Sequence, residues 1–284
     1  MTPPQPPTEI QELWADRDKR ALEVVRASVA ADDLVGALLA IEGAAPEDIA
    51  TCRHQLYQWG ASLHLDPSLA TAVVVLKMTG LIHNELEFSG DANNYYHPDN
   101  SRLSLVVERR RGLPILLSCI WIVIGEVAGV DVQGVGMPGH FLARVGGDGG
   151  ILVDPFGGGR IRSPEECKAI FSHVTDGKVL WRDEFLLATP RPQIVERVLW
   201  NLINATHRSG ELVPCYRHVR TLAELFPERG HLQVLHANLA EQVGALPLAL
   251  SLFREIAQRF ANSPLEQIAA RRIEQLEQRI PWVN

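Results

Sequence analysis

The chain has 284 residues, of which 46% are hydrophobic and 21% are charged. This composition is typical of globular proteins and excludes an intrinsically disordered chain. Acidic residues outnumber basic ones by 34 to 27, so the surface lacks the excess of positive charge that nucleic acids and anionic membranes attract. At about 100–200 residues per domain, the length predicts two domains, or one core with an added module.

The remaining global features favour a cytoplasmic protein. Residues 1–7 (Met-Thr-Pro-Pro-Gln-Pro-Pro) lack the basic and apolar regions of a secretory signal and are interpreted as a disordered leader. No apolar run reaches the ~18–20 residues that span a bilayer. The cysteines form no CxxC pair and fit neither a disulfide framework nor a zinc site. They are Cys52, Cys119, Cys167 and Cys215.

From Thr8 to Phe88 apolar residues recur at helical spacing, which predicts about four helices. Three signals mark helix starts: a capping box at Thr8 and Gln11, the opening Pro46-Glu47-Asp48, and Asp66 as an N-cap before Pro67. Residues 89–100 then break the period with Gly, Asn, Asp and Pro, which favour turns. We therefore expect a long loop there.

The middle of the chain is predicted to be helical and then to form an antiparallel sheet. Ser101–Arg111 is expected to be a short helix, and Pro114 opens a helix to Val127 that is apolar on every face and hence buried. Past Gly129 the period changes from 3.6 to 2. This change predicts strands, joined by a hairpin loop at 146–150, over Asp131–Val135, His140–Val145 and Ile151–Asp154.

From Pro190 onward the pattern is helical again, and it repeats at an offset of 34 residues, the tetratricopeptide period. The matching pairs are Asn204 and Asn238, Gly210 and Gly244, and Phe226 and Phe260. Two copies are fewer than the three or so that are stable alone. We therefore expect this tail to pack on the preceding domain through Leu199 and Leu202, with a third, partial unit ending at Trp282.

Cys119, His140 and Asp154 are candidates for a catalytic site. If the hairpin loop is centred on Asp148, residues whose numbers sum to 296 lie opposite each other. His140 then faces Phe156, and Asp154 is its diagonal neighbour on the same face, about 7–8 Å away. A thiol on a helix packed against that face would complete a nucleophile, a base and an orienting carboxylate, the set used in acyl transfer.

Each of these residues also has a structural interpretation. His140 begins a strand, where a lone histidine is usually structural, and Asp154 precedes a proline, where aspartate is often a turn residue. Cys119 lies in the second turn of its helix, beyond the dipole effect that lowers a thiol pKa, and a free cysteine in an apolar helix is commonly a small hydrophobe. Both interpretations stay open for all three residues.

Three further motifs are interpreted as structural. The GxGxxG pattern at 134–139 is followed by a strand, whereas a dinucleotide site requires a helix there. The glycines at 157–159, before Arg160, could form an anion-binding nest but are more often a flexible turn. The arginines at 109–111 lie beside Glu108, which favours a solvated face or internal salt bridges over contact with nucleic acid.

Four sequence blocks occur in a fixed order: Asn94–Ser101, Glu108–Pro114, Gly134–Phe141 and Asp154–Gly159. Together they resemble the bacterial SirB-type transglutaminase-like family, in which tetratricopeptide-like helices follow the core. The resemblance implies a papain-related α+β core whose site consists of Cys, His and Asp, and it assigns His140 and Asp154 to that site. In active transglutaminase-like enzymes the nucleophile begins the core helix. Here Pro114 holds that place, with Cys119 more than one turn further on.

We therefore expect an α+β protein in four parts: a disordered leader at 1–7, an N-terminal helical region at 8–92, a papain/transglutaminase-like core with an antiparallel sheet at 93–190, and a tetratricopeptide-like α-helical tail at 191–284. The expected function is that of a catalytically silent or weak module that binds a protein or peptide partner or has a regulatory role. The alternative is a cysteine-dependent acyltransferase or amide hydrolase, with Cys119 as nucleophile, His140 as base and Asp154 as orienting residue. We expect no cofactor, metal, nucleic acid or membrane, and the sequence does not indicate the oligomeric state.

Overall fold

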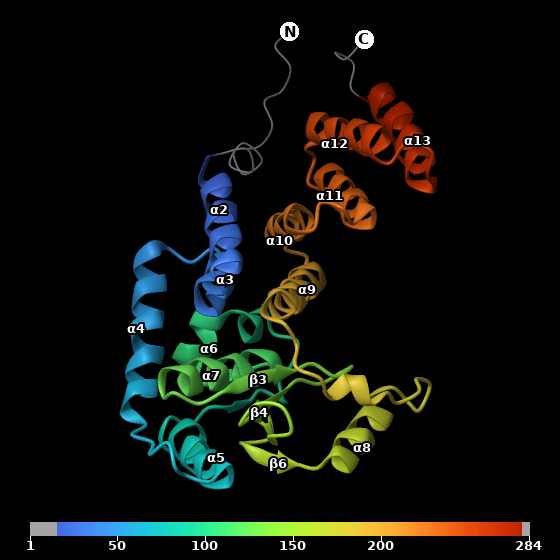
Figure 1. Ribbon diagram of the computed structural model, residues 1–284. Coiled ribbons are helices and arrows are strands. Elements are labelled where there is room, and N and C mark those ends of the chain that lie inside the picture. The colour runs from blue at the N-terminus through green and yellow to red at the C-terminus, as the bar shows by residue number, and fades with distance from the viewer. Residues whose placement is uncertain (1–15, 280–284) are drawn as a thin grey trace. The chain divides into compact units, whose positions relative to one another are not determined.

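The structure is a computed structural model that describes residues 16–279 (Figure 1). It divides into two compact units, one comprising residues 27–198 and the other, within the described residues, 16–26 and 199–279. The predicted leader, the capping box at Thr8 and Gln11, and Trp282 lie outside the described residues. The α-rich architecture with a small antiparallel sheet agrees with the expected α+β class.

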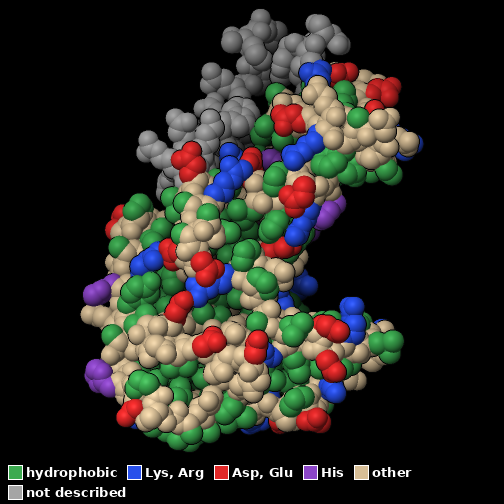
Figure 2. Space-filling model, viewed as in Figure 1, with side chains coloured by type: hydrophobic (Ala, Val, Ile, Leu, Met, Phe, Trp, Pro, Cys, Tyr) green, Lys and Arg blue, Asp and Glu red, His purple; other side chains and the backbone are tan. Residues whose placement is uncertain are grey.

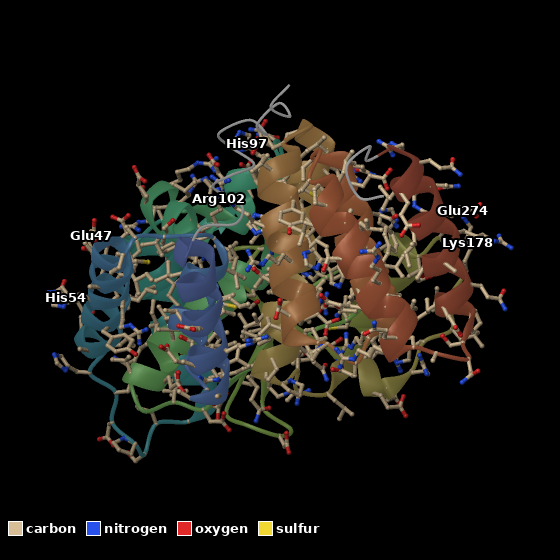
Figure 3. All side chains as sticks on the ribbon, turned by 90° about the horizontal axis from the view of Figure 1, so that it is seen from above. Glu47, His54, His97, Arg102, Lys178 and Glu274 are labelled. Atoms are coloured by element: carbon tan, nitrogen blue, oxygen red, sulfur yellow. The ribbon has the colours of Figure 1, made fainter. Side chains whose placement is uncertain are left out.

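The N-terminal part of the described chain is helical. Its elements are α2 (Asp16–Ala30), α3 (Leu34–Ile41), α4 (Pro46–Ser62), α5 (Thr71–Thr79) and a π-helix (Gly80–Glu85). The predicted start at Pro46 is confirmed, because proline occupies the first helical position, where its missing N–H is not needed. Figure 3 shows Glu47 and His54 pointing outward from α4, whose opposite face is buried.

The helix start predicted at Asp66-Pro67 is wrong. The Asp66 carboxylate accepts hydrogen bonds from the backbone N–H and the hydroxyl of Ser68, at 2.9 and 2.7 Å. This local bonding favours a tight turn over a helix. The following helix, α5, begins at Thr71.

The predicted hairpin lies within a four-stranded antiparallel sheet. The strands β3 (Val132–Val135), β4 (Leu142–Val145), β5 (Ile151–Asp154) and β6 (Arg160–Arg162) are paired in that order. Ala143 lies opposite Val153 and Val145 opposite Ile151, so paired numbers sum to 296 and the predicted register is confirmed. The strand β6 was not predicted from the sequence.

One edge of this sheet is closed by a later segment of the chain. Val135 in β3 forms an isolated antiparallel bridge with Ala188. Next to it, the Thr189 backbone N–H donates to the Gly134 carbonyl at 2.7 Å, and the Thr189 hydroxyl accepts from Gly136. The other edge of the sheet is β6.

The buried helix predicted from Pro114 to Val127 is confirmed as α7, with Pro114–Gly125 all buried. It is preceded by a two-stranded parallel sheet, β1 (Ser89–Gly90) with β2 (Arg111–Gly112), a 3-10 helix (Pro98–Ser101) and α6 (Leu103–Arg109). Two elements that the sequence analysis missed follow the main sheet: α8 (Pro164–Val174) and a 3-10 helix (Asp183–Leu186).

Different helices cover the two faces of the main sheet. A Cβ added to Gly125 of α7 would lie 2.3 Å from Val132, so α7 packs on the face that carries Val132. Val135 and Leu142 form the third register pair after Val132 and Val145, so their side chains point to the opposite face. There they form a buried cluster with residues of α8, Cys167 and Phe171.

Five helices make up the C-terminal part of the described chain, and two of them begin and end at the same offset. They are α9 (Arg191–Ser209), α10 (Leu212–Leu225), α11 (Gly230–Gln242), α12 (Leu246–Arg259) and α13 (Pro264–Arg279). Both ends of α12 lie 34 residues after those of α10, and each of the two helices follows a left-handed glycine, Gly210 or Gly244. Leu199 and Leu202 are fully buried, while their predicted packing on the core stays a prediction. Within residues 16–279, no helix has the length and apolar character needed to cross a bilayer.

Candidate functional site

His140 and Asp154 form a hydrogen-bonded pair at the end of the hairpin. The Nε2 atom of His140 lies 3.1 Å from Oδ1 of Asp154, and their side chains are 12% and 4% exposed. Asp154 is the last residue of β5, whereas β4 begins at Leu142, two residues later than predicted. The predicted contact between the two side chains is therefore confirmed, although His140 lies just outside its strand.

Asp154 is also bound by residues that sequence analysis missed. Arg162 of β6 donates to Oδ2 from Nε and Nη2, at 3.2 and 2.8 Å, and the Gly157 N–H donates to Oδ1 at 3.0 Å. Burial alone would raise the pKa of Asp154, but the hydrogen bond and charge of His140, with the hydrogen bonds of Arg162 and Gly157, outweigh it and lower the pKa to about 2. In the register of β5 and β6, Arg162 lies opposite Leu152 and is therefore the diagonal neighbour of Asp154 on the same face. A third strand predicted after the hairpin would have revealed this contact.

Aromatic rings and an arginine surround His140. Its ring meets the Phe156 ring edge to face, with centroids 6.4 Å apart, and Phe156 in turn meets Tyr95 at 5.9 Å. Arg197 donates to the carbonyl oxygens of Met137 and His140, at 3.3 and 3.4 Å. The ionised Asp154 accepts the Nε2 proton, so a neutral His140 ring carries its lone pair on Nδ1.

Cys119 has a different environment. It is 1% exposed, and burial raises the pKa of its thiol to about 12, an effect that the charge of Arg191 only partly offsets. Its helix, α7, packs on one face of the sheet. Asp154 lies two residues after Leu152 and so shares its face, which is the opposite one that α8 covers. The structure thus brings His140 and Asp154 together and holds the Cys119 thiol in the apolar interior. A catalytic role for the three residues stays a prediction.

Two polar side chains of α7 make hydrogen bonds in the interior of the unit. The Ser118 hydroxyl donates to the Phe141 carbonyl at 3.5 Å, and the Trp121 indole donates to Nε2 of His83 at 3.0 Å. His83 lies in the π-helix, and its Nδ1 bonds the Phe88 carbonyl at 2.6 Å, so both ring nitrogens are used. Burial lowers the pKa of His83. No signal in the sequence marked His83.

The glycine turn after β5 does not form an anion-binding nest. Its N–H groups are used within the turn: Gly157 binds the Asp154 carboxylate, Gly158 the Pro155 carbonyl and Gly159 the Asp154 carbonyl. An incoming anion would have to displace these bonds. The interpretation of residues 157–159 as a turn is therefore the better one.

The arginine run at 109–111 makes internal contacts. Arg109 lies 3.5 Å from Asp91 and 3.8 Å from Asp99. The Arg110 guanidinium stacks over Trp59, 4.4 Å from the ring centroid. This agrees with the interpretation as internal salt bridges.

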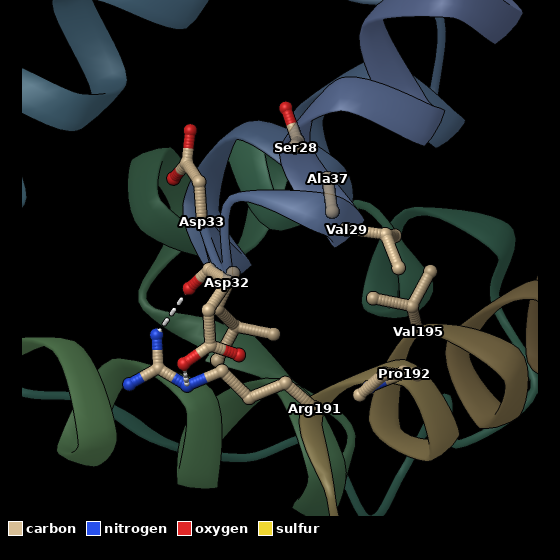
Figure 4. Close-up of a pocket in the computed structure, with 9 residues that line it drawn as sticks. Ser28, Val29, Asp32, Asp33, Ala37, Arg191, Pro192 and Val195 are labelled. Carbon is tan, nitrogen blue, oxygen red and sulfur yellow. Dashed lines mark hydrogen bonds and ion pairs between the residues drawn. The ribbon is translucent and has the colours of Figure 1, made fainter.

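A small pocket lies between α2, α3 and the start of α9 (Figure 4). Its apolar wall includes Val29, Ala37 and Val195. Its arginine, Arg191, is already engaged, because it donates to the Asp32 carbonyl at 2.6 Å and pairs with Glu126. The pocket is therefore a poor site for an anion. Among residues 16–279, no group of three or more His, Cys, Asp or Glu side chains is arranged to hold a metal ion.

Comparison with known proteins identifies a family and several relatives. The model of the transglutaminase-like superfamily matches residues 50–200. UPF0162 proteins of Xylella fastidiosa are 36% identical over 165 residues (strain 9a5c) and 39% identical over 187 residues (strain Temecula1), or 54% and 60% of this chain. The chain spans only 58% and 65% of the lengths of these two curated relatives. Human F-box only protein 21 is 27% identical over 184 residues, which are 60% of this chain and 28% of that protein.

Proposed function

Because the chain belongs to the transglutaminase-like superfamily, we propose that it is a catalytically silent member that acts by binding a protein or peptide partner. We assign it further to the SirB type, with a core at 93–190 and a tetratricopeptide-like tail at 191–284.

The state of the Cys119 thiol is the observation that carries this proposal. A nucleophilic cysteine must be exposed and have a lowered pKa, usually beside an imidazolium or at a helix N-terminus. Cys119 is 1% exposed and its pKa is raised to about 12. The thiol is therefore held in its neutral, weakly nucleophilic form at neutral pH. The N-terminal position of α7 is held by Pro114, which has no nucleophilic group.

The His140–Asp154 pair has a structural use that does not require catalysis. Through Asp154 it connects the residues before β4, the end of β5 and, by way of Arg162, the strand β6. Buried charges are stable when they are paired and hydrogen-bonded, as this carboxylate is. The pair therefore has a structural role in fastening the hairpin, whether or not it takes part in catalysis.

The C-terminal helices support the binding role. The bounds of α10 recur in α12 at the tetratricopeptide period of 34 residues. Stacked helical repeats of this kind form extended concave surfaces that proteins use for binding. We place the protein in the cytoplasm, since all four cysteines are free thiols and buried.

A cysteine-dependent acyltransferase or amide hydrolase is the second candidate. One observation favours it: His140 and Asp154 are hydrogen-bonded as a base and its orienting carboxylate would be. In that case a rearrangement would have to bring the Cys119 thiol to Nδ1 of His140.

Thiol labelling separates the two candidates. The native protein is treated with iodoacetamide at pH 6–7, and the rate at each cysteine is read by mass spectrometry. A silent module labels Cys119 as slowly as the buried Cys52, Cys167 and Cys215, and His140→Ala leaves its rate unchanged. Rapid labelling of Cys119 that is lost in His140→Ala would establish the enzyme and overturn the proposal.

A further inference from the structure

Arg197, in the first half of α9, is a partly buried arginine beside the candidate site. It belongs to the same compact unit as His140, since that unit extends to residue 198. Its Nη2 atom donates to the carbonyl oxygens of Met137 and His140, at 3.3 and 3.4 Å, and burial lowers the pKa of the guanidinium. Two long bonds to neutral carbonyls do not compensate a positive charge that has been partly removed from water.

The lack of a carboxylate partner separates Arg197 from other partly buried arginines of the same unit. Among residues 16–279, no Asp or Glu side chain forms an ion pair with Arg197. Figure 2 shows that basic side chains on the surface in view mostly lie near acidic ones. Four arginines that are no more than a third exposed each lie 2.6 to 3.8 Å from a carboxylate oxygen: Arg53, Arg109, Arg144 and Arg162.

An aromatic ring and a glycine hold the Arg197 guanidinium in place. The guanidinium lies over the Phe141 ring, 5.0 Å from its centroid. A Cβ added to Gly136 would overlap Nη1 of Arg197, so the guanidinium fills the space that a side chain at position 136 would need. A charged group that is positioned in advance loses little conformational entropy when an anion binds to it.

The Tyr95 phenol is a second donor near this guanidinium. Burial raises its pKa, an effect that Tyr96 increases and the positive charge of Arg197 opposes. The phenol therefore stays protonated at neutral pH, and within residues 16–279 its hydroxyl has no hydrogen-bond partner. The Tyr95 ring meets the Phe156 ring, which in turn meets the ring of His140. Two groups that can donate to an anion thus lie beside the candidate site.

We infer that Arg197 and Tyr95 bind a carboxylate group of a polypeptide partner. The inference rests on the proposed function and names the group that is recognised. A carboxylate supplies the missing negative charge, and its two oxygens can accept from both a guanidinium and a phenol.

The donors at this place favour a carboxylate over a phosphoryl group. A phosphoryl group carries more negative charge and has three acceptor oxygens, which are commonly bound by several basic side chains or by a nest of backbone N–H groups. The glycine turn that follows Phe156 offers no such nest, because the N–H groups of residues 157–159 are used within the turn. One arginine and one neutral phenol match a single negative charge.

The test presents the full chain with two synthetic libraries of random peptides, one with free C-termini and one with C-terminal amides. Retained peptides are identified by mass spectrometry, and their dissociation constants are measured by fluorescence anisotropy. We expect the retained peptides to carry a carboxylate. Retention from the free library alone would identify the C-terminal carboxylate as the group that binds. Retention from both libraries would identify the side chain of Asp or Glu.

Three variants of the chain locate the binding site. Arg197→Gln should weaken the binding of retained peptides by about tenfold or more, and Tyr95→Phe by about three- to tenfold. Tyr95→Phe also guards against an effect on folding, because it removes only a hydroxyl that has no partner within residues 16–279. Arg182→Gln is the matched control, since Arg182 is an exposed arginine of the same unit, and it should leave the affinity unchanged. Replacing the carboxylate of a retained peptide by an amide should abolish the effect of Arg197→Gln.

Three results would overturn the inference. One is a set of retained peptides without carboxylates, and another is an affinity that Arg197→Gln or Tyr95→Phe leaves unchanged. The third is displacement of the peptides by inorganic phosphate more strongly than by acetate at equal ionic strength. All three leave the binding of a peptide intact. Failure to retain any peptide would overturn the proposed binding role together with this inference, and the labelling of Cys119 tests the silence of the core separately.

Discussion

Arg162 binds Oδ2 of Asp154 through two nitrogens, from a strand that sequence analysis did not detect. His140 holds the other oxygen of the same carboxylate. The carboxylate is almost fully buried, at 4% exposure, so its charge depends on these two partners for compensation.

Replacing Arg162 by alanine should destabilise the protein by about 2–4 kcal/mol, because the buried Asp154 charge loses two hydrogen bonds and its guanidinium. The free energy of unfolding is measured by urea denaturation. Arg160→Ala is the control, since Arg160 is an exposed residue of the same strand. Equal effects of the two substitutions would show that the ion pair contributes nothing specific.

Substitutions of Cys119 should report a packing role. Cys119→Ala removes a small buried group and should cost at most about 1–2 kcal/mol. Cys119→Ser should cost more than Cys119→Ala, because it places a hydroxyl in an apolar interior. Thermal denaturation of the two variants ranks them, and a serine variant as stable as the alanine variant would contradict a dry environment.

Acid should destabilise the C-terminal helices through His236. This buried histidine bonds the Tyr216 hydroxyl at 3.1 Å, and burial, with the charge of Arg220, lowers its pKa from 6.5 to about 4. The neutral form is favoured in the folded state, so the stabilisation is complete above pH 6.5 and is lost as the pH falls toward 4, by up to about 3 kcal/mol.

The measurement for His236 is the free energy of unfolding as a function of pH for the unmodified chain and for His236→Gln. The variant should lose the slope between pH 6.5 and 4. His231→Gln, at an exposed position of the same helix, should keep it. An unchanged slope in His236→Gln would assign the acid sensitivity to other groups.

Gly90→Ala should disturb the environment of His140. An added Cβ would lie 2.5 to 2.6 Å from three atoms of the Phe156 ring, which packs on His140. Displacement of Phe156 should raise the rate at which diethylpyrocarbonate modifies His140, as read by mass spectrometry. Gly80→Ala is the control, because its added Cβ meets nothing within 4 Å. Identical rates in both variants would show that Phe156 does not shield the ring.

The sequence predicted the elements whose signal is local and repeated. Period-two alternation and a glycine loop centred on Asp148 were enough for the register of β4 and β5, and Pro114 marked the start of α7. The strand β6 was missed because three residues are too few to show an alternation. The side of the sheet on which Cys119 lies was not predictable, because it depends on how α7 crosses over to β3 and not on spacing along the chain.

The two edges of the main sheet bear on how the chain behaves when it is concentrated. An open edge offers unpaired backbone groups to the strands of other molecules and is a common route to fibrils. Here Ala188 and Thr189 occupy the outer side of β3, and the opposite edge is only three residues long with an arginine at each end. Short, charged edges repel a second sheet. The hairpin that holds His140 is thereby protected from sheet-to-sheet polymerisation, and the outer side of β3 is closed to any ligand that would bind by adding a strand.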